Sequence, residues 1–86
     1  MENRDELYAF LKEQCAFNEK ESCEYLNMLY EANFKTFDQI FDRFDDLKKH
    51  QFRMSTETQA KIINELYRHK NEKLAGYALN LNMTSL

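Results

Sequence analysis

The chain lacks most of the residues on which a β-sheet depends. It has no valine and no proline, and Gly76 is its single glycine. Strands favour β-branched side chains, and tight hairpins need glycine, often as Asn-Gly or Asp-Gly. Seven phenylalanines and five tyrosines supply large side chains for a core instead. With 86 residues, the sequence therefore predicts one small domain of the all-α class.

Four segments carry the signature of a helix start, in which a polar capping residue is followed three positions later by Glu or Gln. They are Asn3–Glu6, Asn18–Glu21, Thr36–Gln39 and Thr56–Gln59, with Ser55 as an alternative cap for the last. Apolar residues recur at helical spacing after each of them. These patterns predict two helices of medium length, a short one and a long last one.

A fifth helix, also short, is expected over residues 45–49, because acidic residues at its start and lysines at its end suit the helix dipole. The first helix should end near Cys15. The second should end near Asn33, since asparagine tolerates the left-handed conformation of a helix stop. The chain is thus expected to form a small bundle of five helices.

The long last helix is expected to run from Thr56 to Lys73. The segment that follows has no capping signal and little periodicity. We therefore expect residues 1–73 to form the domain and residues 74–86 to form a frayed or disordered tail.

The apolar stripes of these helices define the expected core. Its members are Leu7, Phe10, Leu11, Leu26, Leu29, Phe37, Ile40, Phe41, Leu47, Phe52, Ile63 and Leu66. The phenylalanines are expected to hold the two short helices between the longer ones, because short helices have little apolar surface of their own.

Acidic and basic residues are unevenly distributed along the chain. Residues 1–46 hold 12 acids and 5 bases, a net charge of −7, whereas residues 47–86 hold 3 acids and 7 bases, a net charge of +4. The net charge of the whole chain is −3. A split of this kind affects association and steering rather than the fold.

The order of the helices resembles that of the sterile alpha motif (SAM) domain, a five-helix interaction module with a long final helix. The family's second half reads D-L, a hydrophobic residue in a short turn, a polar helix start, K-I-L and a further apolar residue. Here these places are taken by Asp46-Leu47, Phe52, Ser55-Thr56, Lys61-Ile62-Ile63 and Leu66. The resemblance covers residues 5–70, and Gln51 stands where the family usually has glycine.

The resemblance implies a non-catalytic module for protein–protein interaction or oligomerisation. SAM domains often associate head to tail, with an acidic surface on the middle helices meeting a basic surface at the start of the last helix. Here the acidic face would comprise Asp38, Asp42, Asp45 and Asp46. The basic face would comprise Lys48, Lys49, Arg53 and Lys61, with Phe52 and Met54 as exposed apolar anchors.

A nucleic-acid-binding domain of helix-hairpin-helix or SAM type, using the turn from Lys48 to Arg53, is the alternative. Such a turn brings backbone N–H groups close to phosphate with the help of glycine, and the domains that use it are usually basic. This turn has no glycine, and the chain has a pI of about 5.3. A nucleic-acid partner is therefore not expected.

Catalytic and metal sites are not expected either. The soft metal ligands are Cys15, Cys23, His50 and His69, whose spacing fits no zinc pattern. The sequence has no glycine-rich loop for a nucleotide cofactor. Both histidines are expected at the surface.

The sequence shows no signal peptide and no apolar run of the roughly 18 residues that a membrane span needs. An intracellular setting, cytoplasmic or nuclear, is therefore expected, with reduced cysteines; a Cys15–Cys23 disulfide is the alternative. The resemblance implies that the partner is the domain itself or another SAM-like domain, within a larger signalling or transcription-regulatory protein. If Leu86 is the native end, Thr84-Ser85-Leu86 fits a PDZ ligand.

Overall fold

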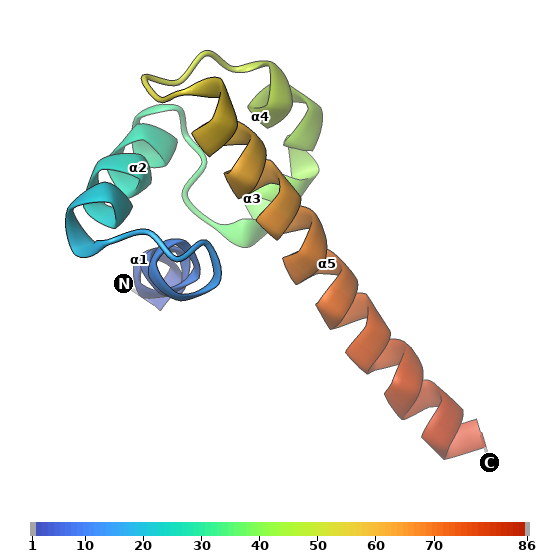
Figure 1. Ribbon diagram of the computed structural model, residues 1–86. Coiled ribbons are helices and arrows are strands. Elements are labelled where there is room, and N and C mark those ends of the chain that lie inside the picture. Colours follow the sequence, from blue (N-terminus) through green and yellow to red (C-terminus); the bar gives the residue numbers. More distant parts are fainter. Residues whose placement is uncertain (1, 86) are drawn as a thin grey trace.

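The computed structural model describes the backbone of residues 2–85 and the side chains of residues 4–72. The elements are α1 (Glu2–Ala9), a π-helical turn η1 (Phe10–Gln14), α2 (Glu19–Glu31), α3 (Phe37–Asp42), α4 (Phe44–Lys49) and α5 (Thr56–Ser85). No strand occurs in the described backbone, and the predicted all-α class with five helices and a long last helix is confirmed. The shorter helices surround the first half of α5, with α1 and α2 to one side (Figure 1).

The first helix begins earlier than predicted and ends as predicted. It starts at Glu2, so Asn3 lies inside it and is not its cap. A side-chain cap is not obligatory where water can bond the first N–H groups. At its other end, the Cys15 N–H bonds to the Phe10 carbonyl at 3.0 Å, five residues back, which makes the last turn π-helical. Ala16 then adopts a left-handed conformation with φ 61° and turns the chain towards α2.

Both ends of α2 are those predicted. Asn18 accepts a hydrogen bond from the Glu21 N–H at 2.8 Å, and the Glu21 carboxylate accepts one from the Asn18 N–H at 3.0 Å. At the other end Asn33 is left-handed, with φ 66°. The N–H of Phe34 bonds to the Leu29 carbonyl at 2.8 Å, and that of Asn33 to the Tyr30 carbonyl at 3.0 Å. This is a Schellman motif, which ends the helix and turns Phe34 into the core.

The start of α5 is the one predicted, with the alternative cap. Ser55 is the cap, since its hydroxyl accepts a hydrogen bond from the Thr58 N–H at 3.1 Å, and Thr56 is the first helical residue. Gln59 is therefore not part of a capping box. Its amide donates to the His50 carbonyl at 2.8 Å and so ties the segment before α5 to the helix.

The end of α5 differs from the prediction, because the helix continues from Lys73 to Ser85. This stretch has no proline to stop the helix, and its leucines and alanines favour helix. The division of the chain after residue 73 stays a prediction. The PDZ-ligand motif includes Leu86, which lies outside the described residues.

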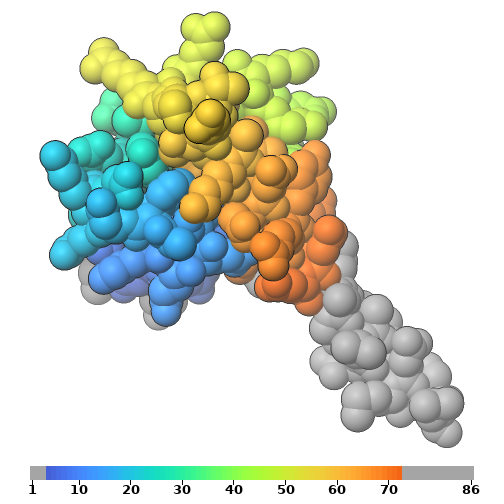
Figure 2. Space-filling model, viewed as in Figure 1, coloured from blue at the N-terminus to red at the C-terminus, as the bar shows by residue number. Residues whose placement is uncertain are grey.

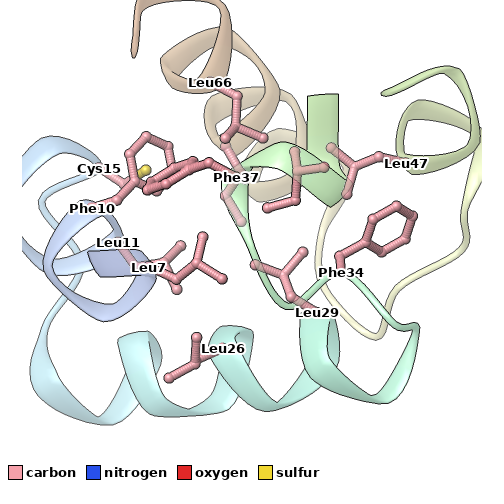
Figure 3. Packing of buried hydrophobic residues seen from close by; sticks show 12 residues of the cluster. Leu7, Phe10, Leu11, Cys15, Leu26, Leu29, Phe34, Phe37, Leu47 and Leu66 are labelled. Carbon is pink, nitrogen blue, oxygen red and sulfur yellow. The ribbon is translucent and has the colours of Figure 1, made fainter. Parts of the chain in front are cut away.

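The core lies between α5 and the four shorter helices (Figure 3). Most of the predicted members are buried, and Phe41, Phe52 and Ile63 pack against them while remaining half-buried. Phe41 and Ile63 belong to α3 and α5, whereas Phe52 lies in the segment that joins α4 to α5. The buried hydrophobic residues are Leu7, Phe10, Leu11, Cys15, Leu26, Leu29, Phe34, Phe37, Ile40, Leu47, Ile62 and Leu66.

Replacing Ala16 by glycine is expected to raise the free energy of unfolding by about 0.5–1 kcal/mol, because glycine adopts positive φ without the steric cost that alanine has. Urea denaturation followed by circular dichroism measures the change. Ala60→Gly is the matched control, since Ala60 is exposed within α5 and glycine there should cost about 1 kcal/mol. Equal losses in both variants would contradict the expectation.

Candidate functional site

The predicted acidic face gathers where α3 meets α4. Asp42 at the end of α3 and Asp45 and Asp46 in the first turn of α4 line a hollow of about 300 Å³, together with Phe41, Arg43 and Phe44. Asp38 lies one turn earlier on α3, is exposed, and does not line this hollow. The structure thus brings three of the four predicted aspartates together.

Arg43 organises this acidic hollow, and the sequence did not single it out. It is the residue between α3 and α4. Its guanidinium donates to the Asn33 carbonyl at 3.2 Å, and its Cζ lies 4.4 Å from the Phe34 ring centroid. Its Nε is 3.6 Å from a carboxylate oxygen of Asp46. Arg43 therefore holds the end of α2 against the hollow and pairs with one of its acids.

Two of the aspartates remain unpaired. Among the residues whose side chains are described, neither Asp38 nor Asp42 forms an ion pair. Asp42 lines the hollow and Asp38 stands beside it. Their charges are therefore available to a partner without the loss of an internal contact.

Lys48 joins the acidic residues to the predicted basic face, because it pairs with Asp45 and also lines a groove with Lys49. Its ammonium is 3.3 Å from the Asp45 carboxylate and donates to the Tyr67 hydroxyl at 3.4 Å. The Tyr67 hydroxyl, followed by Asp45, raises the pKa of Lys48 above its ordinary value, so the side chain stays charged. The Phe44 ring, which meets Tyr67 edge to face at 4.8 Å, lies beneath the ammonium.

The other predicted anchors line a groove at the start of α5. This groove of about 400 Å³ runs between the end of α4, the 50–54 segment and the first turns of α5. Lys49, Phe52 and Met54 line it, together with Lys48 and Ile63. Phe52 is half-buried, and its ring centroid lies 4.3 Å from that of the exposed His50. The 50–55 segment stands at one end of the molecule, between α2 and α4 (Figure 2).

The remaining two basic residues point elsewhere. Arg53 lines a different groove, of about 590 Å³, whose other wall is α2 with Glu24 and Glu31. The ammonium of Lys61 lies 5.2 Å from the Phe17 ring centroid, beside the connection between η1 and α2. Because Lys48, Arg53 and Lys61 diverge, no observation favours a phosphate site at this turn.

His69 is not at the surface as predicted. It is half-buried, and its ring stacks on that of Phe37 at a centroid distance of 4.3 Å and an angle of 15°. The prediction failed because the facing α3 supplies Phe37 and covers this side of α5. Across the side chains that the structure describes, no three or more His, Cys, Asp and Glu residues gather as a metal site.

The two cysteines differ in exposure and both are free. Cys15 is fully buried and Cys23 is exposed on α2. Burial, with a smaller contribution from the Glu65 carboxylate, raises the pKa of the Cys15 thiol from 9.0 to about 12, and Lys61 opposes this shift. Since the thiolate is the reactive species, Cys15 is held in its unreactive form.

A maleimide reagent at pH 8 is therefore expected to label Cys23 and to leave Cys15 unmodified, as mass spectrometry would show. In urea both should react. Equal labelling of both thiols in buffer would contradict the buried position.

The free energy of unfolding should also depend on the Cys15 thiol, because the folded chain holds the Cys15 proton more tightly than the unfolded chain. This contribution to stability is fully present below about pH 9 and is lost as the pH rises towards 12.

Comparison with protein-family models, curated proteins and solved structures finds no match to this chain. Within its described part, no helix is both long enough and apolar enough to cross a membrane. The surfaces described above are therefore the basis on which a function can be argued.

Proposed function

We propose that this chain is a non-catalytic protein-association domain of the SAM type, part of a larger intracellular protein, whose copies bind one another head to tail. One observation carries the proposal: an acidic hollow and a basic groove are lined by different residues and adjoin at α4, where Lys48 of the groove pairs with Asp45 of the hollow. Signalling and transcription regulation are the settings to which the resemblance points. A second SAM-like domain in another protein is a partner of the same kind.

The two surfaces are complementary in more than charge. The acidic hollow has the half-buried rings of Phe41 and Phe44 beside its carboxylates. The groove has Phe52 and Met54 beside Lys49. Charged residues mainly steer association and set specificity, whereas desolvated aromatic anchors supply much of the affinity. Each surface therefore offers both kinds of contribution.

A pairing of two different surfaces has a consequence for assembly. Each copy that binds leaves one acidic hollow and one groove free at the two ends of the complex. Unless the rotation between copies closes a ring, such a heterologous contact produces open chains. The proposal therefore predicts association that grows with concentration rather than stopping at a dimer.

Analytical ultracentrifugation across a wide concentration range tests this. At low salt the average mass is expected to rise steadily, and at high salt it should fall, since ions screen exposed charges beyond about 10 Å at 0.1 M. Lys49→Glu and Asp42→Lys should each weaken association about tenfold or more, because each brings like charges together. Mixing the two variants should restore at least one contact, because the unaltered hollow of the Lys49→Glu copy can bind the unaltered groove of the Asp42→Lys copy.

The matched controls are Asp5→Lys and Lys12→Glu, which make the same charge changes on the exposed side of the first helix, outside both surfaces. They should associate like the original chain. A strict monomer at all concentrations, or equal association by all four variants, would overturn head-to-tail pairing through these surfaces.

A further inference from the structure

The exposed sides of α2 and α5 carry the same spacing of polar residues with their charges reversed. On both helices the intervals are four, three and four residues, which keeps the side chains on one stripe of the helix. The α2 stripe consists of Lys20, Glu24, Asn27 and Glu31. The α5 stripe consists of Glu57, Lys61, Asn64 and Arg68. All eight side chains are exposed.

The two stripes do not satisfy each other within one molecule. Among the described side chains, no hydrogen bond or ion pair joins a residue of the α2 stripe to one of the α5 stripe. Arg68 pairs with Glu65 of its own helix at 3.4 Å, and the Arg68 side chain is 68% exposed. The Glu65 side chain is 16% exposed, but a pair three residues apart on one helix contributes only about 0.2–0.5 kcal/mol. Lys61 rests on the Phe17 ring, and no carboxylate whose position the structure describes forms an ion pair with it.

We propose that a second copy of this chain lays its α5 stripe along the α2 stripe, with the two helices parallel. This contact goes beyond the proposed function, because it uses neither the acidic hollow nor the groove at the start of α5. It shares with the proposed function the assumption that the domain associates with itself. It also gives Lys61 a role that the basic groove does not.

The order of charges along the two stripes favours a parallel orientation of the helices. In parallel helices equivalent stripe positions face each other, so Lys20 meets Glu57, Glu24 meets Lys61, Asn27 meets Asn64 and Glu31 meets Arg68. Every charged residue then has an opposite partner, and two asparagine amides meet between them. In an antiparallel pair the order reverses, so that Lys20 faces Arg68 and Glu31 faces Glu57. Like charges placed together suppress that arrangement.

The surroundings of the α2 stripe leave room for a helix. Glu24, Asn27 and Glu31 form one wall of the groove of about 590 Å³ that faces the 50–53 segment. Met28 and Ala32, both half-buried, lie between them and add apolar surface. The α2 stripe spans eleven residue intervals, or about 16 Å at 1.5 Å per residue. The α5 stripe has the same length, so the two can meet along their whole extent.

Cysteine cross-linking tests the contact and its register. Cys23→Ser first removes the exposed thiol, and Cys15 stays buried. In this background a copy with Asn27→Cys is mixed with a copy with Asn64→Cys under mild oxidation. The disulfide-linked heterodimer is expected to form about tenfold faster than with Asn71→Cys in place of Asn64→Cys. Asn71 is also exposed on α5, on the same side but seven residues, or about 10 Å, further on.

Charge reversal provides a second test of the same contact. Glu24→Lys, placed in the Asn27→Cys copy, is expected to slow cross-linking about tenfold, and Lys61→Glu, placed in the Asn64→Cys copy, should do the same. Mixing the two reversed copies should restore the original rate, because the pair is re-formed with its charges exchanged. Equal rates for Asn64→Cys and Asn71→Cys, or reversals without effect on the rate, would overturn the proposal.

The cross-linking result can be distinguished from the result of the head-to-tail test. Asp42→Lys and Lys49→Glu should leave the cross-linking rate unchanged, since neither residue belongs to a stripe. Cross-linking that persists while these variants fail to alter sedimentation would refute head-to-tail pairing and support the stripe contact. Sedimentation that depends on them, with no register preference in cross-linking, would refute the stripe contact alone.

Discussion

Replacing Phe34 by alanine is expected to lower the free energy of unfolding by about 3–5 kcal/mol, the usual cost of removing a fully buried phenylalanine. Phe34 is 0% exposed and follows the left-handed Asn33 at the end of α2. Its ring lies beneath the Arg43 guanidinium and 6.3 Å from the Phe52 ring, measured between centroids. It therefore joins α2 to the acidic hollow and to the segment before α5.

A loss of this size is large for so small a domain. Stability is typically about 0.05–0.15 kcal/mol per residue, so the variant should be partly unfolded in buffer and unfold at a much lower urea concentration. Circular dichroism during urea titration measures this. Phe34→Leu keeps most of the volume and is the control, with an expected loss below about 1.5 kcal/mol. Similar losses for leucine and alanine would contradict the packing role assigned to the ring.

Replacing Leu66 by alanine is expected to cost about 2–5 kcal/mol. Ile62 and Leu66, one turn apart, are the buried hydrophobic side chains in the described part of α5, at 3% and 1% exposure. Much of the attachment of this long helix to the rest of the domain therefore depends on two positions. Removing one of them should loosen α5 before it unfolds α2.

Hydrogen exchange distinguishes this from a uniform loss of stability. In Leu66→Ala the amides of the first half of α5 should exchange markedly faster, while those of α2, which retains both of its capping motifs, should change less. Asn64→Ala is the control on the same helix, because Asn64 is exposed and a surface change of this kind is usually within about 0.5 kcal/mol. Equal acceleration in α2 and α5 would show that the domain opens as one unit.

The candidate surfaces were only partly predictable. The clustering of Asp42, Asp45 and Asp46 follows from their closeness in sequence at a junction of two short helices. Of the basic set, Lys48, Lys49, Phe52 and Met54 are also close in sequence and line one groove. Arg53 and Lys61 diverge from them, to the groove beside α2 and to the η1–α2 connection. Arg43 could have been noticed as a lone base among acids, but its contact with the Asn33 carbonyl depends on how α2 and α3 meet.

The sequence by itself determined the local structure. The capping box at Asn18, the left-handed stop at Asn33 and most of the core stripes were predicted, because they depend on hydrogen bonds and periodicities within a few residues. Only the tertiary structure decided what each half-exposed side chain meets. Lys48 reaches Tyr67, nineteen positions away, and His69 stacks on Phe37 across the interface of α3 and α5. Helical spacing specifies the side of a helix on which a residue lies, whereas its neighbour depends on the packing of helices that are distant in sequence.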